Sequence, residues 1–136
     1  MPRPVSVVVA ICAASAGAHA ALVPQHLDHE LRLGIAFVAA TAALLAAAAA
    51  LTYRPDDATV AHATTVVLAA LIGAYAVNVT TGLPWLSDGP ETVDVVGLAT
   101  KSVEVLGLLF AIHLAISPRS KAGVAHSPTR RLDHEH

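Results

Sequence analysis

The sequence predicts an all-α integral membrane protein, an up-and-down four-helix transmembrane bundle with both termini in the cytoplasm. Its composition is too apolar for an ordinary soluble domain of 136 residues, because 55% of the residues are hydrophobic and only 13% are charged. A helix needs about 20 apolar residues to cross the roughly 30 Å hydrocarbon layer of a bilayer. The chain offers four such stretches, separated by short polar breaks, at residues 5–23, 33–53, 59–81 and 92–117.

The first two stretches differ in how clearly they end. Pro24 follows the first one, and a proline at this place indicates a turn or a new helical start. The second stretch is the clearest of the four, because only Thr41 interrupts the apolar run from Leu33 to Leu51. Its many alanines are good helix formers and small packing surfaces, which favours close helix approach within lipid.

The remaining breaks complete the domain organisation. The polar segment Arg54-Pro55-Asp56-Asp57 forms a tight loop, and we expect an aspartate of this loop to cap the third helix. The connection at residues 81–90 contains two prolines and two glycines, so it excludes a continuous helix, and Trp85 is expected at the membrane interface. The chain therefore divides into a transmembrane domain, 1–117, and a polar cytoplasmic tail, 118–136, which we expect to be disordered.

The distribution of lysine and arginine predicts the orientation. If the amino terminus lies inside, six basic residues outside the spans fall on the cytoplasmic side and only Arg32 falls on the outer side. Cytoplasmic segments of membrane proteins are enriched in these residues, so the asymmetry predicts a multi-pass protein of the cell membrane with both termini inside. The six are Arg3, Arg54, Arg119, Lys121, Arg130 and Arg131.

A secretory signal peptide is the alternative for the first stretch. Arg3 gives a short basic start, an apolar core follows, and Ala18-His19-Ala20 is similar to a cleavage site. Cleavage after Ala20 would leave three helices and an amino terminus outside. We expect the uncleaved four-helix form, because the apolar stretch continues past this triplet to Val23.

The fourth stretch carries charged residues at depths where a membrane helix is normally apolar. Asp94 and Lys101 are seven residues apart and Lys101 and Glu104 are three apart, so one stripe of this helix is polar. Counted from Thr92, Lys101 lies about 13 Å deep and Glu104 about 18 Å deep. Such groups are costly unless they are paired or line a wet cavity. The pair either joins the helices as an ion pair or forms part of a proton or ion relay.

A second polar group is expected in the first outer loop. His26, His29 and Glu30 are three and four residues apart, so a helix would place them on one side. Imidazole and carboxylate groups can bind a divalent metal ion, and His19 could add a ligand if the chain folds back at Pro24. The alternative is an interfacial segment whose histidines are simply solvated.

Two further histidines are expected near the cytoplasmic face. His62 lies early in the third stretch and His113 late in the fourth, so both should lie at a similar depth. Two facing imidazoles can ligate a haem. Aromatic side chains that would surround a porphyrin are scarce, with two Phe, two Tyr and one Trp in the chain. No cofactor is the expectation, with a divalent metal or haem as the alternatives.

Three segments carry a family resemblance. They are residues 19–34, which include Pro24-Gln-His26-Leu-Asp-His-Glu30, residues 73–84, which end in Thr81-Gly-Leu-Pro84, and residues 97–104, Gly97-Leu-Ala-Thr-Lys-Ser-Val-Glu104. Over most of residues 10–110 the chain resembles small, alanine-rich, uncharacterised four-helix integral membrane proteins of actinobacteria. The resemblance implies the four-helix membrane fold and an uncleaved first helix, and it implies no biochemical activity.

Three classes of function remain. The first is a structural or accessory component of the lipid bilayer that packs against another copy or a larger membrane partner, and the sequence favours this class. The second is a transport component for a proton, a metal ion or a small solute, and the third is a haem or copper redox protein. No nucleophile elbow or phosphate loop occurs, and a net charge of −2 offers no attraction to polyanions, so we expect neither an enzyme nor a nucleic-acid partner.

Overall fold

Four long α-helices make up the protein. The computed structural model describes residues 3–82, 93 and 95–117, with the exception of the His29 side chain. The helices are α1 (Pro4–His29), α2 (Leu31–Tyr53), α3 (Ala58–Thr80) and α4 (Val95–Ile116). Each is long and apolar enough to cross a membrane, judged by length and composition. The tail predicted at 118–136 and the predicted interfacial Trp85 lie outside the described residues.

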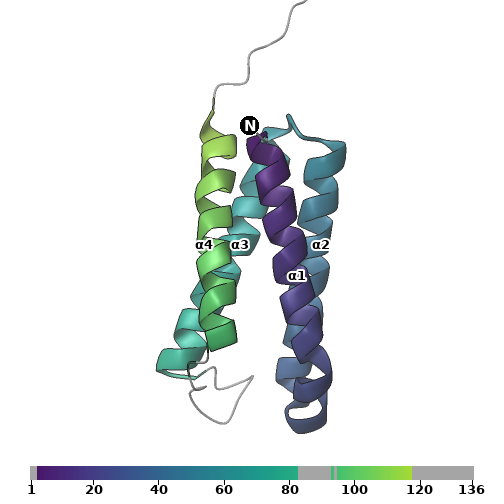
Figure 1. Ribbon diagram of the computed structural model, residues 1–136, viewed down its shortest axis with the longest axis vertical. Helices are drawn as coiled ribbons and strands as arrows, with labels where there is room; N and C mark the ends of the chain where they lie inside the picture. The colour runs from purple at the N-terminus through teal and green to yellow at the C-terminus, as the bar shows by residue number, and fades with distance from the viewer. Residues whose placement is uncertain (1–2, 83–92, 94, 118–136) are drawn as a thin grey trace, which may run out of the picture.

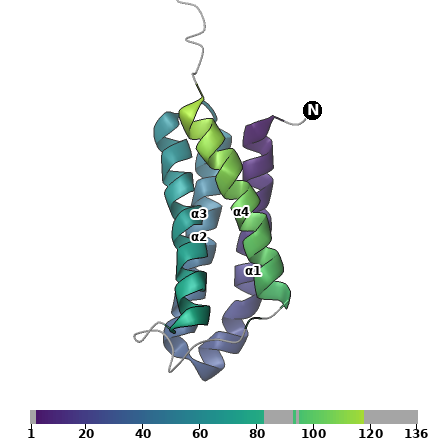
Figure 2. The same ribbon diagram turned by 90° about the vertical axis from the view of Figure 1, so that its left-hand side faces the viewer.

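The helices run alternately up and down and form a ring. Contacts join α1 to α2, α2 to α3, α3 to α4 and α4 back to α1, while the backbones of the diagonal pairs of described helices do not come close to each other. The start of α1 and the end of α4 lie at the same end of the bundle (Figure 1). The view turned by 90° shows α4 slanting across the bundle from the side of α3 toward α1 (Figure 2), and the contacts between α1 and α4 make the first and last helices neighbours.

The predicted turn at Pro24 is wrong, because α1 continues through this residue to His29. A proline removes one backbone hydrogen bond from a helix, and membrane helices tolerate this loss where neighbouring groups compensate. The pyrrolidine ring of Pro24 lies at the surface of the bundle, because Pro24 is exposed. The helix ends instead at Glu30, whose backbone is extended (φ −141°) and which alone connects α1 to α2.

The close turn between α1 and α2 depends on a glycine. A Cβ atom at Gly34 would lie 2.8 Å from the backbone nitrogen of Leu27 and 2.6 Å from its Cδ2 atom. Any larger residue at this position would therefore push the start of α2 away from the end of α1.

The apolar core fills the half of the bundle that is nearer the two chain ends. It is built by the first half of α1, the second half of α2, the middle of α3 and the end of α4. The buried members are Val8, Cys12, Ala16, Leu44, Ala48, Leu51, Leu68 and Ala111. Buried polar residues lie mainly beyond this core, in the middle of the bundle, so the interior changes character along its length.

The predicted helix cap at Asp57 is confirmed. Its carboxylate accepts a hydrogen bond of 2.8 Å from the backbone N–H of Thr59, at the start of α3. This hydrogen bond lowers the pKa of Asp57 below its ordinary value of 3.8, with a smaller lowering from the nearby Arg54. The charged carboxylate is therefore the form that stabilises the first turn of α3.

The cap predicts a defined pH dependence. Because the folded-state pKa of Asp57 lies below the unfolded value, its stabilisation is complete above pH 3.8 and is lost as the pH falls through the folded-state pKa. We expect Asp57→Ala to lower the thermal unfolding midpoint in detergent at about pH 7 and to have a much smaller effect at about pH 2. A difference between the two proteins that stays constant with pH would contradict this assignment.

The approach of α4 to α1 gives a second prediction. A Cβ atom at Gly107 would lie 2.6 Å from Cγ2 of Ile11, and the β-branched side chain of Ile11 has little freedom to move. We expect Gly107→Ala to destabilise the bundle by about 1–3 kcal/mol through overpacking.

Gly73→Ala on α3 is the matched control, because a Cβ atom there meets nothing within 4 Å. Alanine is the better helix former by about 1 kcal/mol, so this variant should be as stable as the wild type or more stable. The free energy of unfolding in detergent should be measured for both variants. Equal changes would show that α4 does not pack closely against α1 at Gly107.

Candidate functional site

The two charged residues of α4 meet in the interior. The ammonium Nζ of Lys101 lies 2.7 Å from the carboxylate Oε2 of Glu104, as expected for neighbours three residues apart on a helix. The Glu104 side chain is completely buried, and the Lys101 side chain is 13% exposed. A charged carboxylate that is completely buried is costly without a cationic partner, and Lys101 is this partner.

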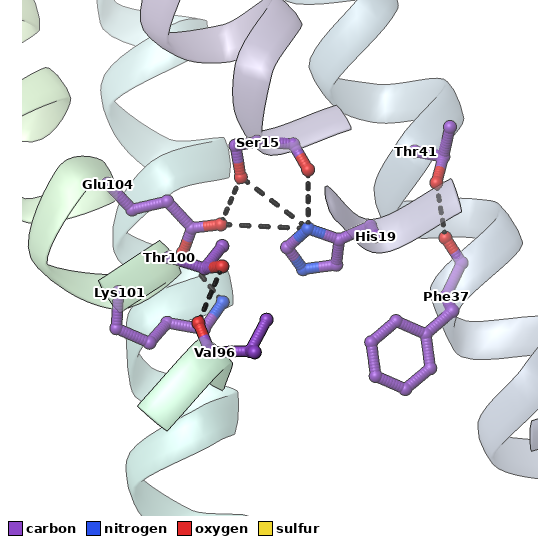
Figure 3. Close-up of polar contacts among 8 residues, drawn as sticks. All are labelled: Ser15, His19, Phe37, Thr41, Val96, Thr100, Lys101 and Glu104. Atoms are coloured by element: carbon purple, nitrogen blue, oxygen red, sulfur yellow. Dashed lines mark hydrogen bonds and ion pairs between the residues drawn. The ribbon is translucent and has the colours of Figure 1, made fainter. Parts of the chain in front are cut away.

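The second oxygen of Glu104 is satisfied from α1. The hydroxyl of Ser15 donates a short hydrogen bond to Oε1 of Glu104, across 89 positions of sequence (Figure 3). Most other described hydroxyl groups in the helices donate to a carbonyl four residues earlier on their own helix, as Thr64 and Ser102 do. The Ser15 hydroxyl differs from these groups, because it donates to a residue of another helix.

His19 lies beside this pair, one turn further along α1. Its Nδ1 atom is 2.9 Å from the backbone carbonyl oxygen of Ser15, which can only accept, so Nδ1 carries the hydrogen and donates. The same nitrogen lies 3.8 Å from Oε1 of Glu104. The second ring nitrogen, Nε2, lies on the side of the ring that points away from Ser15 (Figure 3). In the neutral ring Nε2 is therefore the atom that can accept a proton or a hydrogen bond.

A cavity of about 530 Å³ opens beside the cluster, in the half of the bundle that the apolar core leaves unfilled. All four helices line it. Its polar lining residues are His19, Gln25, His26, Tyr75, Asn78, Thr100 and Lys101. Glu104 is absent from the lining and lies behind Lys101, so the charge that borders the cavity is the ammonium group.

Tyr75 on α3 contributes a second unusual polar group. Its hydroxyl is buried and has no hydrogen-bond partner among the residues that the structure describes. Its ring lies under the Lys101 ammonium, with 5.6 Å between Nζ and the ring centroid. This distance is within the range of a cation–π attraction, so the α3 ring stabilises the α4 cation from its other side.

The outer residues predicted as metal ligands are only partly brought together. The Nδ1 atom of His26 lies 2.9 Å from the carbonyl oxygen of Leu22, and its ring stacks against Phe37 with 4.5 Å between centroids. Glu30 lies in the turn between the helices. Among the described residues no group of three His, Cys, Asp or Glu side chains is placed to hold a metal ion. The His29 side chain lies outside the described part.

The residues predicted for a haem site lie on the outside of the bundle. His62 and His113 are both exposed. The Nδ1 atom of His62 donates to the carbonyl of Ala58 at 2.7 Å, and His113 contacts Ser117, which directly follows α4. Neither imidazole lines the interior cavity. Asp94, the third residue of the predicted polar stripe, lies outside the described residues.

Two residues of the site have no counterpart in the sequence analysis. Ser15 precedes His19 by four residues, a spacing that places two polar side chains on one face of an apolar helix and could have indicated a polar contact. Tyr75 carries no comparable signal, because a single tyrosine in a membrane helix is unremarkable. Searches against models of known families, curated proteins and solved structures found no match to the chain.

The Ser15–Glu104 hydrogen bond can be tested by its contribution to stability. Ser15→Ala leaves Oε1 of the buried carboxylate without its donor, so we expect a loss of about 1.5–3 kcal/mol in the free energy of unfolding. Ser102→Ala is the matched control, because the Ser102 hydroxyl is exposed and donates only to its own helix. It should change stability by less than about 0.5 kcal/mol. Similar losses for both variants, measured by unfolding in detergent, would argue against the bond.

Proposed function

We propose that the protein is a transport component of the cell membrane that exchanges protons through Glu104 and admits a small polar solute to the cavity. The observation that carries this proposal is the position of Lys101, which borders a cavity of about 530 Å³ on one side and holds the buried Glu104 on the other. An ion pair that served only to join helices would need no polar cavity beside it.

The proposal includes an orientation with both termini in the cytoplasm. Arg3 and Arg54 flank one end of the bundle and Arg32 the other, and the further basic residues follow α4. The cavity then opens toward the outer face, where α1 joins α2. Glu104 lies nine residues into α4, at about 14 Å, which is close to the middle of the hydrocarbon layer.

An uncleaved first helix is also part of the proposal. Ser15 and His19 both precede the point after Ala20 where a signal peptidase would cut. Removal of residues 1–20 would take away the α1 partner of the buried carboxylate and open the ring between α2 and α4.

A structural or accessory role is the second candidate, and the hydrogen bond from Ser15 to Glu104 favours it. This bond and the Lys101 ion pair join α1 to α4 without any need for a mobile proton or solute. In this role the exposed apolar side chains of α4 would contact lipid, another copy of the chain or a larger membrane partner.

Proton flux in liposomes tests the transport proposal. Vesicles that contain wild-type protein should dissipate an imposed pH gradient, as a trapped pH-sensitive dye reports. Glu104→Gln should slow this by about 100-fold or more, because the amide keeps the size of the side chain but cannot exchange a proton.

Glu30→Gln is the control variant, because Glu30 lies in the α1–α2 turn and takes no part in the buried cluster. It should retain the wild-type rate. Wild-type vesicles that hold the gradient as well as protein-free vesicles would exclude proton exchange and leave the structural role. A Glu104→Gln rate equal to that of the wild type would also contradict the proposal.

A further inference from the structure

The cavity presents hydrogen-bond donors and a positive charge at its α4 wall. Lys101 has three N–H groups, and Glu104 accepts from one of them at 2.7 Å. No other acceptor for this ammonium occurs among the described residues, so two N–H groups remain beside the cavity that Lys101 lines. Because Glu104 is fully buried behind it, a solute in the cavity meets the cation first.

A further donor stands on α3. Tyr75 lines the same cavity, and its buried hydroxyl has no acceptor within the described part of the chain. Buried hydroxyl groups in folded proteins normally have a partner, so this one indicates a missing acceptor. The hydroxyl is covered in this structure, so a turn of the Tyr75 side chain must bring it to the cavity; a carboxylate, which has two oxygens, can then accept from Lys101 and from Tyr75 at the same time.

The opposite wall of the cavity is apolar and aromatic. Phe37 of α2 lies at its centre, flanked by Leu33 and Ala40. The rings of His19 and His26 lie against Phe37, with centroid distances of 5.6 Å and 4.5 Å. A volume of about 530 Å³ is within the range of small-molecule sites, in which an apolar lining surrounds a few polar groups.

We propose that this cavity binds a small monocarboxylate with an apolar or aromatic body. The carboxylate accepts hydrogen bonds from Lys101 and Tyr75, and the body lies against Phe37. A cation is disfavoured because the charge at the wall is positive, and a dianion such as phosphate would bring two negative charges to a single ammonium. The inference rests on the proposed function and names the solute class for the same cavity.

The charge balance of the site implies that one proton is taken up when the carboxylate binds. Glu104 already neutralises Lys101, so an incoming carboxylate would leave an uncompensated negative charge in a low-dielectric interior. Nε2 of His19 is placed to take up one proton as the anion binds. The titratable groups around His19 are His26 on α1, Tyr75 on α3, and Lys101 and Glu104 on α4. The described lining residues of α2 carry no titratable group.

Equilibrium binding of benzoate tests the solute class. In titration calorimetry of the purified full chain in detergent, benzoate should bind, and the neutral isostere benzamide should bind at least about tenfold more weakly. Tyr75→Phe should weaken benzoate binding about fivefold through loss of one donor. Tyr53→Phe is the matched control, because Tyr53 is 84% exposed at the end of α2, and it should bind like the wild type.

Benzamide binding as tight as benzoate, or Tyr75→Phe with unchanged affinity, would overturn the carboxylate site. The absence of any benzoate binding to the wild type would overturn it as well. Equal losses in Tyr75→Phe and Tyr53→Phe would show that the loss does not arise in the cavity, and would overturn the role of Tyr75 as a donor.

The pH dependence of benzoate binding tests the uptake of this proton. Between about pH 6 and 8 benzoate stays ionised, so uptake of one proton by the site should raise its affinity about tenfold for each unit by which the pH falls. His19→Gln should remove this slope, whereas His26→Gln should keep it. A flat pH profile for the wild type, or a slope that survives in His19→Gln, would overturn the role of His19.

These binding measurements can fail independently of the flux experiment. Benzoate binding without proton flux would contradict the transport function and leave the carboxylate site intact. Proton flux that depends on Glu104, together with no benzoate binding, would support transport and overturn the solute class proposed for the cavity.

Discussion

A carboxylate buried in the middle of an apolar helix bundle must find both its counter-charge and its hydrogen-bond donors within the protein, and Glu104 imposes this constraint on the fold. Its own helix supplies Lys101, and the donor to its second oxygen is Ser15 of α1. The first and last helices must therefore be neighbours. Gly107, one turn beyond Glu104, permits this contact by leaving room for Ile11.

The buried cluster also marks a boundary along the bundle. Toward the start of α1 and the end of α4 the interior is a packed apolar core, and toward the α1–α2 turn it is a cavity whose mostly apolar lining carries a few polar groups. In the proposed transport role, a solute in the cavity would meet Lys101 and then a closed interior. The hydrogen bond from Ser15 to Glu104 lies at this boundary and joins α1 to α4.

Sequence reasoning predicted the features that depend on local order. Helix number, the approximate spans, the Asp57 cap and the proximity of Lys101 and Glu104 all follow from composition or spacing within one helix. The continuation of α1 past Pro24 was not predicted, because lipid-embedded helices tolerate a proline better than soluble ones do. Ser15 and Tyr75 were missed because their roles depend on how each helix is rotated about its axis. Alanine-rich helices that are apolar on every side carry little record of that rotation.

The connectivity of the cluster has a consequence for biogenesis. Because a single residue joins α1 to α2, these two helices can pack against each other as a hairpin before α4 has been synthesised. Until α4 packs against α1, the hydroxyl of Ser15 lacks the carboxylate to which it donates, and Glu104 gains this donor only when α1 is in place. Docking of the final helix therefore closes the ring and completes the polar centre in one step, so a chain cut short before α4 lacks the native site.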